Sequence, residues 1–376
     1  MNAIVIGAGP AGSLAAILLA RAGARVTLIE HARFPRDKVC GECLSALGRS
    51  VLKRHDLEAE LLHAGAIELT HTRLISSDSS VTLDLPQPML GISRAVLDQH
   101  LLSKAHAAGV GVLQPWRVES LMPPPSPGLP EEGVLLPPFP VIRERVGVRA
   151  RDLTHNVIDE LHADYIVLAD GRGSFLNDKP AFTGDLGIKT HYVDIEAMPN
   201  TITLYAVAGC YGGVAPIEGD RWNVAFSVPA ERVKRAGGDV ARVFDDLMRT
   251  NPTMMTHFAN ARRTGDWLAA PLPRYAPRTD WPVHVIPLGN AAGAIEPIGG
   301  EGMGLALRSA ELAVEAILTD RLDRLPAQYE KLWRKRRLFC RLGAMAMSNR
   351  TTASLSIDLL NTELLTSRPV LSLIGK

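Results

Sequence analysis

Three glycines near the start of the sequence have the spacing of a dinucleotide-binding turn. Gly7, Gly9 and Gly12 follow the apolar run 4–6 and open a segment with helical periodicity. A pyrophosphate needs a tight turn, a backbone that it can approach closely and a helix N-terminus that points at it. The motif, which also contains Ala11, therefore predicts a site that binds the phosphates of a dinucleotide.

One acidic residue completes this unit. Residues 26–29 form a second apolar run, and Glu30 follows it, eighteen residues after Gly12. A carboxylate at this position can accept hydrogen bonds from the hydroxyls of the adenosine ribose. The strand–helix–strand order predicts a right-handed βαβ unit, but this unit alone does not distinguish FAD from NAD.

Cys40 and Cys43 form a C-x-x-C pair after the second predicted strand. A redox disulfide would indicate a disulfide reductase, but that class has a wider cysteine spacing and a second glycine fingerprint, which this sequence lacks. A zinc site needs more ligands at a matching spacing, and none are evident, so no metal site is predicted. A third explanation depends on the family resemblance described below.

The composition indicates an ordinary soluble protein of more than one domain. The chain has 376 residues, 46% of them hydrophobic and 22% charged, and its formal charge of +1 gives no electrostatic reason to expect nucleic-acid binding. Residues 1–22 lack the basic start of a signal peptide, and no apolar run reaches the ~18 residues of a membrane span. Four cysteines in so long a chain do not form a disulfide framework, so a cytoplasmic location is expected.

Three later segments resemble one group of flavoproteins. They are PRDKVCGECLS at 35–45, VLADGRGS at 167–174 and PLGNAAGAIEPIGGEGMGLALRSAELA at 287–313. Together they resemble the matching segments of aromatic hydroxylases, flavin-dependent halogenases and geranylgeranyl reductases. The resemblance implies one stably bound FAD, with NAD(P)H as a transient reductant.

The resemblance also implies a fold class and a division into domains. The expected fold is α/β: a Rossmann-like FAD-binding domain with an inserted, mainly antiparallel β substrate domain and C-terminal helices. The FAD-binding domain is expected at 1–67, 94–182 and 283–335, the substrate domain at 68–93 and 183–282, and a helical cap at 336–376. The proline-rich residues 122–140 are expected to form an inserted surface loop.

Site residues are carried over from the family position by position. Asp170 and Gly171 match a pair near the cofactor, although a plain turn is the alternative. Asn290 stands where the family usually has an aspartate that binds the ribityl chain; its amide can still accept and donate hydrogen bonds, but it removes a negative charge. Gly302 and Met303 match the helix start that faces the flavin pyrimidine, with a tightly packed loop as the alternative.

The same resemblance implies further residues that contact the cofactor or the substrate. Arg94 matches an arginine that reaches the cofactor, and the alternative is a solvated pair with Asp98. Val118 matches the position whose backbone meets the adenine, and ordinary strand packing is the alternative. The residues Cys40, Gly41 and Glu42 resemble the CGE motif of the geranylgeranyl reductases, which lines the flavin and the substrate; Cys43 is then incidental.

Two aromatic motifs of the family help to distinguish between the possible reactions. The halogenase segment W-x-W-x-I-P is absent, and all five tryptophans are isolated. The reductase strand Y-x-W-x-F-P matches a segment that keeps Tyr211 and Pro216 but has Gly213 and Ala215 in place of the two large aromatics. These small residues, with Gly212, predict a wider pocket.

We therefore expect a monooxygenase that hydroxylates a bulky aromatic or polyketide-like substrate with NAD(P)H and oxygen. Tyr211 is the preferred catalytic candidate, with Cys40 and Glu42; His191, Tyr192 and Tyr205 are weaker ones. The CGE motif favours the alternative, a reductase of alkene bonds in a lipid. A halogenase, or a non-catalytic flavin protein suggested only by Asn290, are further alternatives.

The expected partner is a small-molecule or lipid-like substrate, with at most peripheral membrane contact; the sequence does not indicate an oligomeric state. The C-terminal residues 355–376 are apolar for a terminus and follow a basic run. That run contains Arg334, Lys335, Arg336, Arg337 and Arg341. An amphipathic helix packed on the flavin domain, with a solvated basic face, is the alternative to lipid contact.

Overall fold

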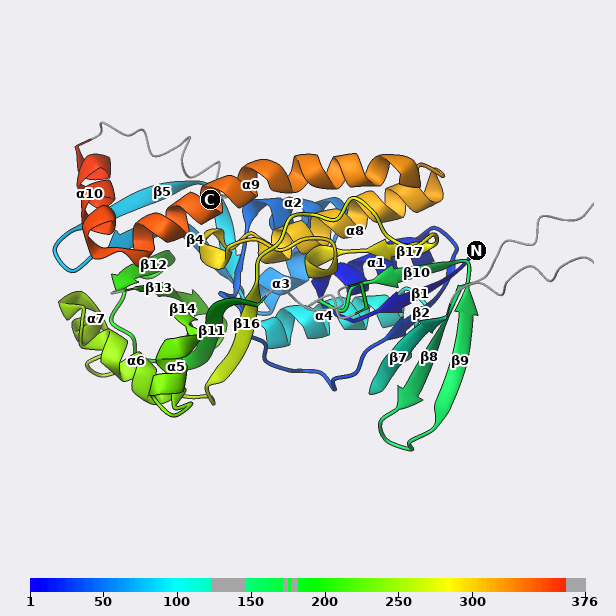
Figure 1. The fold of residues 1–376 in the computed structure, drawn as a ribbon, viewed down its shortest axis with the longest axis horizontal. Helices are drawn as coiled ribbons and strands as arrows, with labels where there is room; N and C mark the ends of the chain where they lie inside the picture. Colours follow the sequence, from blue (N-terminus) through cyan, green and yellow to red (C-terminus); the bar gives the residue numbers. More distant parts are fainter. Residues whose placement is uncertain (123–145, 172–174, 177–181, 208, 363–376) are drawn as a thin grey trace, which may run out of the picture.

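A computed structural model describes residues 1–122, 146–171, 175–176, 182–207 and 209–362 of the chain. Its first sheet is parallel, with the strand order β17–β10–β1–β2–β6 (Figure 1). The strands are β1 (Asn2–Ile6), β2 (Arg25–Ile29), β6 (Gly111–Leu113), β10 (Tyr165–Leu168) and β17 (Val285–Pro287). Because the carboxyl ends of parallel strands meet at one edge, the turns after β1, β10 and β17 lie together there.

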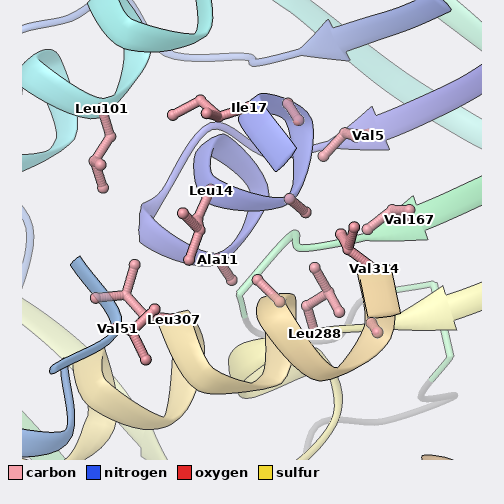
Figure 2. Close-up of a cluster of buried hydrophobic side chains, with 14 of the residues drawn as sticks. Val5, Ala11, Leu14, Ile17, Val51, Leu101, Val167, Leu288, Leu307 and Val314 are labelled. Carbon is pink, nitrogen blue, oxygen red and sulfur yellow. The ribbon is translucent and has the colours of Figure 1, made fainter. Parts of the chain in front are cut away.

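Helices cover this sheet and bury its apolar side chains. The helices of this part are α1 (Pro10–Arg21), α2 (Ala46–Arg54), α3 (Ala59–His63), α4 (Arg94–Ala107) and α8 (Gly302–Leu318). Leu14 of α1, Leu101 of α4 and Leu307 of α8 belong to one fully buried cluster (Figure 2). Each such side chain contributes roughly 1.5–3 kcal/mol by leaving water, so α1 is held firmly between the sheet and its neighbours.

The second sheet is mainly antiparallel, with the order β15–β11–β14–β13–β12–β4–β5–β3, and β16 also pairs with β11. Only β12 and β4 run parallel within it. Its strands are β3 (Cys43–Leu44), β4 (Ile67–Ile75), β5 (Ser80–Gly91), β11 (Phe182–Val193), β12 (Thr201–Val207), β13 (Cys210–Ile217), β14 (Arg221–Pro229), β15 (Arg262–Arg263) and β16 (Leu268–Pro273). Three short helices, α5 (Ala230–Arg235), α6 (Val240–Met248) and α7 (Pro252–His257), pack into its hydrophobic cluster.

A small third sheet packs beside the parallel one. It contains β7 (Trp116–Met122), β8 (Val146–Asp152) and β9 (Ile158–Ala163), all antiparallel. The proline-rich insertion predicted at 122–140 begins where β7 ends, and its residues from 123 onward lie outside the described residues.

The C-terminal helices join the two larger sheets. Helix α9 (Leu325–Ser348) contacts α8 at one end and β12 and β13 at the other, and α10 (Arg350–Asn361) follows it (Figure 1). The predicted boundary at 335 falls inside α9, so the helix begins within the segment expected for the FAD-binding domain. The apolar terminus predicted to contact lipid lies outside the described residues from 363 onward.

The predicted fold class is confirmed. Short 3₁₀ turns at Gly289–Ala291, Pro297–Gly299 and Leu322–Arg324 complete the secondary structure of the described residues. Of the helices between residues 1 and 362 that the structure describes, none is both long and apolar enough to cross a bilayer.

Candidate functional site

The turn between β1 and α1 depends on glycine at two positions. Gly7 has a φ of +97°, and a Cβ there would lie 2.4 Å from the carbonyl oxygen of Ala169. A Cβ on Gly12 would lie 1.8 Å from the carbonyl oxygen of Gly7. Gly9 is the N-cap residue of α1 and offers no side chain to the first N–H groups of the helix. These groups are therefore available to an anionic ligand.

Glu30 holds this turn in place from the end of β2. Its Oε2 accepts from the N–H of Ala8 and its Oε1 from the N–H of Ala32, both at 2.8 Å. Burial would raise the pKa of Glu30, but hydrogen bonds from His31, Ala32 and Ala8 lower it to about 2. The side chain is thus ionised at neutral pH, and each oxygen keeps acceptor capacity for the predicted ribose contact.

A cavity of about 210 Å³ lies between the starts of α1 and α8 and the ends of β10 and β17; we call it the cofactor cavity. The predicted site residues that line it are Gly9, Ala11, Cys40, Gly41, Glu42, Arg94, Gly171, Asn290, Gly302 and Met303. The predicted residues that do not line it are Gly7, Gly12, Glu30, Val118 and Asp170. Val118 lies in β7 within a hydrophobic cluster that includes Ile29, as ordinary strand packing would place it.

The second helix start in this cavity matches the needs of a flavin. Helix α8 begins at Gly302, and no side chain caps its first turn. The cavity therefore has two uncapped helix N-termini, one for a pyrophosphate and one for the ring that becomes negative on reduction. Asn290 is exposed at the cavity wall, where its amide can meet hydroxyl groups. This donor set fits FAD.

Arg94 lines the cofactor cavity and is buried, with 6% of its surface exposed. Its Nε and Nη2 donate to the two carboxylate oxygens of Asp98 at 2.9 and 2.7 Å. The alternative explanation was a solvent-exposed pair of Arg94 with Asp98. The pair is present, but it is buried. The bidentate pair instead fixes a guanidinium at the cavity wall.

Glu42 is the centre of an ion-pair network between the segment 37–42 and β11. Its Oε1 lies 3.0 Å from Nζ of Lys189, and its Oε2 lies 2.7 Å from Nε2 of His191. Asp37 Oδ1 lies 2.9 Å from the same ammonium. Asp37, Glu42 and His191 have ligand atoms close enough together for a metal ion, but the Lys189 ammonium already binds both carboxylates. Sequence reasoning missed Asp37 and Lys189, because they lie 152 residues apart in the chain.

A second cavity, of about 140 Å³, opens beside the first and is lined mainly by β12, β13 and β14; we call it the substrate cavity. Seven residues line both cavities: Val39, Cys40, Gly41, Cys43, Leu272, Pro297 and Gly300. Cys43 was expected to be incidental, yet it lies in this shared wall. No disulfide joins Cys40 and Cys43.

The small residues that were predicted to widen the substrate pocket have close neighbours of their own. A Cβ on Gly212 would lie 2.2 Å from the ring of Phe226, and one on Gly213 would lie 2.2 Å from the carbonyl oxygen of Thr203. The two glycines therefore admit a neighbouring aromatic ring and a neighbouring strand. A pocket wider than that of the reductases stays a prediction.

Tyr211 lies at the end of the substrate cavity and is buried. Its hydroxyl donates to Oε1 of Glu296, and Oε2 of Glu296 lies 2.6 Å from Nε of Arg274. Burial raises the pKa of Tyr211 well above its ordinary value, and the nearby Glu296 raises it further. Burial likewise raises the pKa of Glu296. Tyr211 is therefore a neutral hydrogen-bond donor at physiological pH.

The weaker candidates have structural contacts. The hydroxyl of Tyr205 lies 2.6 Å from Nδ1 of His257 in a fully buried site, and Tyr192 packs edge-on against Phe258. His191 is the exception, since it binds Glu42 at the cofactor cavity.

Comparison with known proteins shows what this arrangement is similar to. Residues 1–123 match the model of the FAD binding domain. The first third of the chain is thus similar to FAD-binding domains, in agreement with the donor set of the cofactor cavity. The chain is 26% identical over 355 residues to a menaquinone reductase of Mycobacterium tuberculosis H37Rv, covering 86% of the present chain and 78% of that protein.

Two solved structures share the fold. The flavin-dependent brominase Bmp2 superposes with a TM-score of 0.80 at 20% identity, covering 100% of this chain and 94% of the brominase. A geranylgeranyl bacteriochlorophyll reductase-like protein from Thermoplasma acidophilum gives a TM-score of 0.76 at 19% identity, with coverages of 100% and 96%. At such identities the likeness concerns the fold.

Proposed function

We propose that this protein is an FAD-dependent monooxygenase that hydroxylates an aromatic or polyketide-like substrate, with NAD(P)H as the transient reductant. The observation that carries the proposal is the size and lining of the substrate cavity. An apolar protein cavity of roughly 150 Å³ holds one benzene ring, and this cavity measures about 140 Å³. Its apolar walls include Ile202, Leu204 and Phe226.

The residues of the cavity support this chemistry in three ways. The apolar walls exclude water from the ring. The shared wall at Cys40 and Gly41 allows the ring to lie directly against the cofactor cavity. The Tyr211 hydroxyl donates its one proton to Glu296, so its oxygen is left to accept a hydrogen bond from a hydroxyl group on the substrate. FAD, when bound, would supply hydride uptake from NAD(P)H and oxygen activation.

The overall reaction balances with these reactants. One atom of O₂ enters a C–H bond of the ring, and the other leaves as water. NAD(P)H provides the two electrons, and one proton comes from solvent.

The test is turnover of the FAD-loaded protein with NADPH or NADH in air, in the presence of a panel of phenols and aromatic polyketides. Substrate should stimulate NAD(P)H oxidation and oxygen uptake, and ¹⁸O₂ should place one labelled oxygen in the product. Oxidation of NAD(P)H that no compound of the panel stimulates, with no labelled product, would overturn the proposal.

A reductase is the second candidate, because relatives that match over 84–86% of this chain and 75–78% of their own length are named menaquinone reductases. The same protein would then transfer hydrogen to an alkene bond of a lipid. An anaerobic reaction with menaquinone, in which the side chain gains two hydrogen atoms, would favour this candidate over the hydroxylase.

A further inference from the structure

We propose that a third cavity, lined by arginines of α9, binds an anionic group carried by the substrate. The inference rests on the proposed function, since it specifies the substrate class of that same site. This arginine cavity measures about 1030 Å³ and lies between α9, β13 and the segment 274–276. It is large enough for the body of a ligand whose ring fills the substrate cavity.

Three arginines on one face of α9 provide its positive charge. Arg334, Arg337 and Arg341 all line the cavity and are exposed. None of the three has an ion pair with any carboxylate of the described residues. Arg336, on another face of the same helix, differs, because its Nε lies 3.0 Å from Oε2 of Glu301.

The two acidic groups of the cavity share one arginine. Asp185 and Glu296 both bind Arg274, at 2.7 and 2.6 Å, and Glu296 also accepts the hydroxyl of Tyr211. Even with both acids ionised, Arg274 and the three α9 arginines outnumber them by four to two, so an excess of positive charge faces the cavity. A planar guanidinium binds carboxylate, sulfonate or phosphate oxygens with paired hydrogen bonds, so these are the groups that this cavity fits.

The arginine cavity borders the site of the proposed chemistry. Tyr211 and Ser227 are cross-strand partners in β13 and β14, and both line the substrate cavity as well as the arginine cavity. Ile295 lines both the arginine cavity and the cofactor cavity. A ligand can thus place its ring beside the cofactor and extend past Tyr211 to the arginines. The substrate class is an aromatic compound that carries an anionic group.

Two fluorescent probes with related rings test this inference without turnover. 1-Anilinonaphthalene-8-sulfonate has a sulfonate, and N-phenyl-1-naphthylamine has the same rings without it. Titration of the FAD-loaded protein should show tighter binding of the sulfonate probe. The double variant Arg337→Gln/Arg341→Gln should weaken that probe about tenfold or more and leave the neutral probe unchanged.

The matched control is Lys331→Gln/Lys335→Gln, which removes the same charge from exposed positions of α9 outside the cavity. It should leave both probes unchanged. The inference is overturned if the two probes bind equally, or if the lysine and arginine variants weaken the sulfonate probe alike. NADPH could also displace the probe and bind more weakly to the arginine variant. That result would assign the cavity to the reductant and would overturn the inference. The titration measures binding and not product. A failure of this inference can therefore be told apart from a failure of the hydroxylase proposal.

Discussion

The cofactor cavity and the substrate cavity share a wall but are built from different parts of the chain. The cofactor cavity is shaped by backbone: the turn at Gly7 and Gly12 and the uncapped starts of α1 and α8. The substrate cavity is shaped by side chains on β12, β13 and β14, among them Tyr211 and Phe226. A backbone site tolerates few substitutions, whereas a side-chain site can be reshaped one residue at a time. We therefore expect that substitutions can change the substrate selectivity without changing FAD binding.

The largest effect is expected from Gly12→Ala, in the glycine turn that leads to the cofactor cavity. The new Cβ would lie 1.8 Å from the Gly7 carbonyl oxygen, so the turn must open. We expect a loss of more than about 4 kcal/mol, because a rigid backbone clash cannot relax locally. Flavin absorbance retained after gel filtration, with circular dichroism for the fold, measures the outcome. Gly111→Ala is the control, since its Cβ would have an ordinary contact at 3.6 Å; equal flavin retention in both variants would contradict the prediction.

A smaller and more selective effect is expected from Ala215→Phe in the substrate cavity. Ala215 is buried in the cavity wall, so a phenyl ring there would occupy the space proposed for the substrate ring. Overpacking should cost about 1–3 kcal/mol in stability. Binding of N-phenyl-1-naphthylamine should fall at least about tenfold, while FAD content stays that of the wild type. Ala215→Ser is the volume-matched control. If the phenylalanine variant loses FAD, the two cavities are not independent.

A third effect, which depends on pH, concerns Glu301, the residue before α8. Burial raises its pKa to about 7 despite the nearby Arg336 and Ser45. A carboxyl group with a raised pKa stabilises the fold while protonated, and this contribution is lost as the pH rises through 7. Glu301→Gln should therefore gain stability relative to wild type between pH 5 and pH 8, by up to about 3 kcal/mol.

Thermal unfolding at a series of pH values, with FAD held at one saturating concentration, measures this difference. Glu315→Gln, an exposed position on the same helix, should show a difference that changes little with pH. If the stability difference between Glu301→Gln and the wild type did not change with pH, a raised pKa of Glu301 would be contradicted.

The sequence predicted local features well and distant ones poorly. The strand, glycine turn and helix around Gly7 depend on neighbouring residues, so the pattern was sufficient to find them. The fold class followed from the order of such units. The Lys189–Glu42 pair and the Tyr211–Glu296 pair were not predictable, because each joins segments that meet only when the two sheets pack. Gly212 illustrates the same limit: its neighbour Phe226 is set by strand register, which the sequence does not display.

The segment 37–43 has a consequence for building chimeric proteins. By sequence position it belongs with the dinucleotide unit, yet Asp37 and Glu42 bind Lys189 and His191 of β11. Exchange of the antiparallel sheet with that of a relative would separate these partners and leave Glu42 as a buried charge without its counter-ions. Such a charge typically costs 3–5 kcal/mol. A chimera that folds must therefore take residues 37–43 and β11 from the same parent protein.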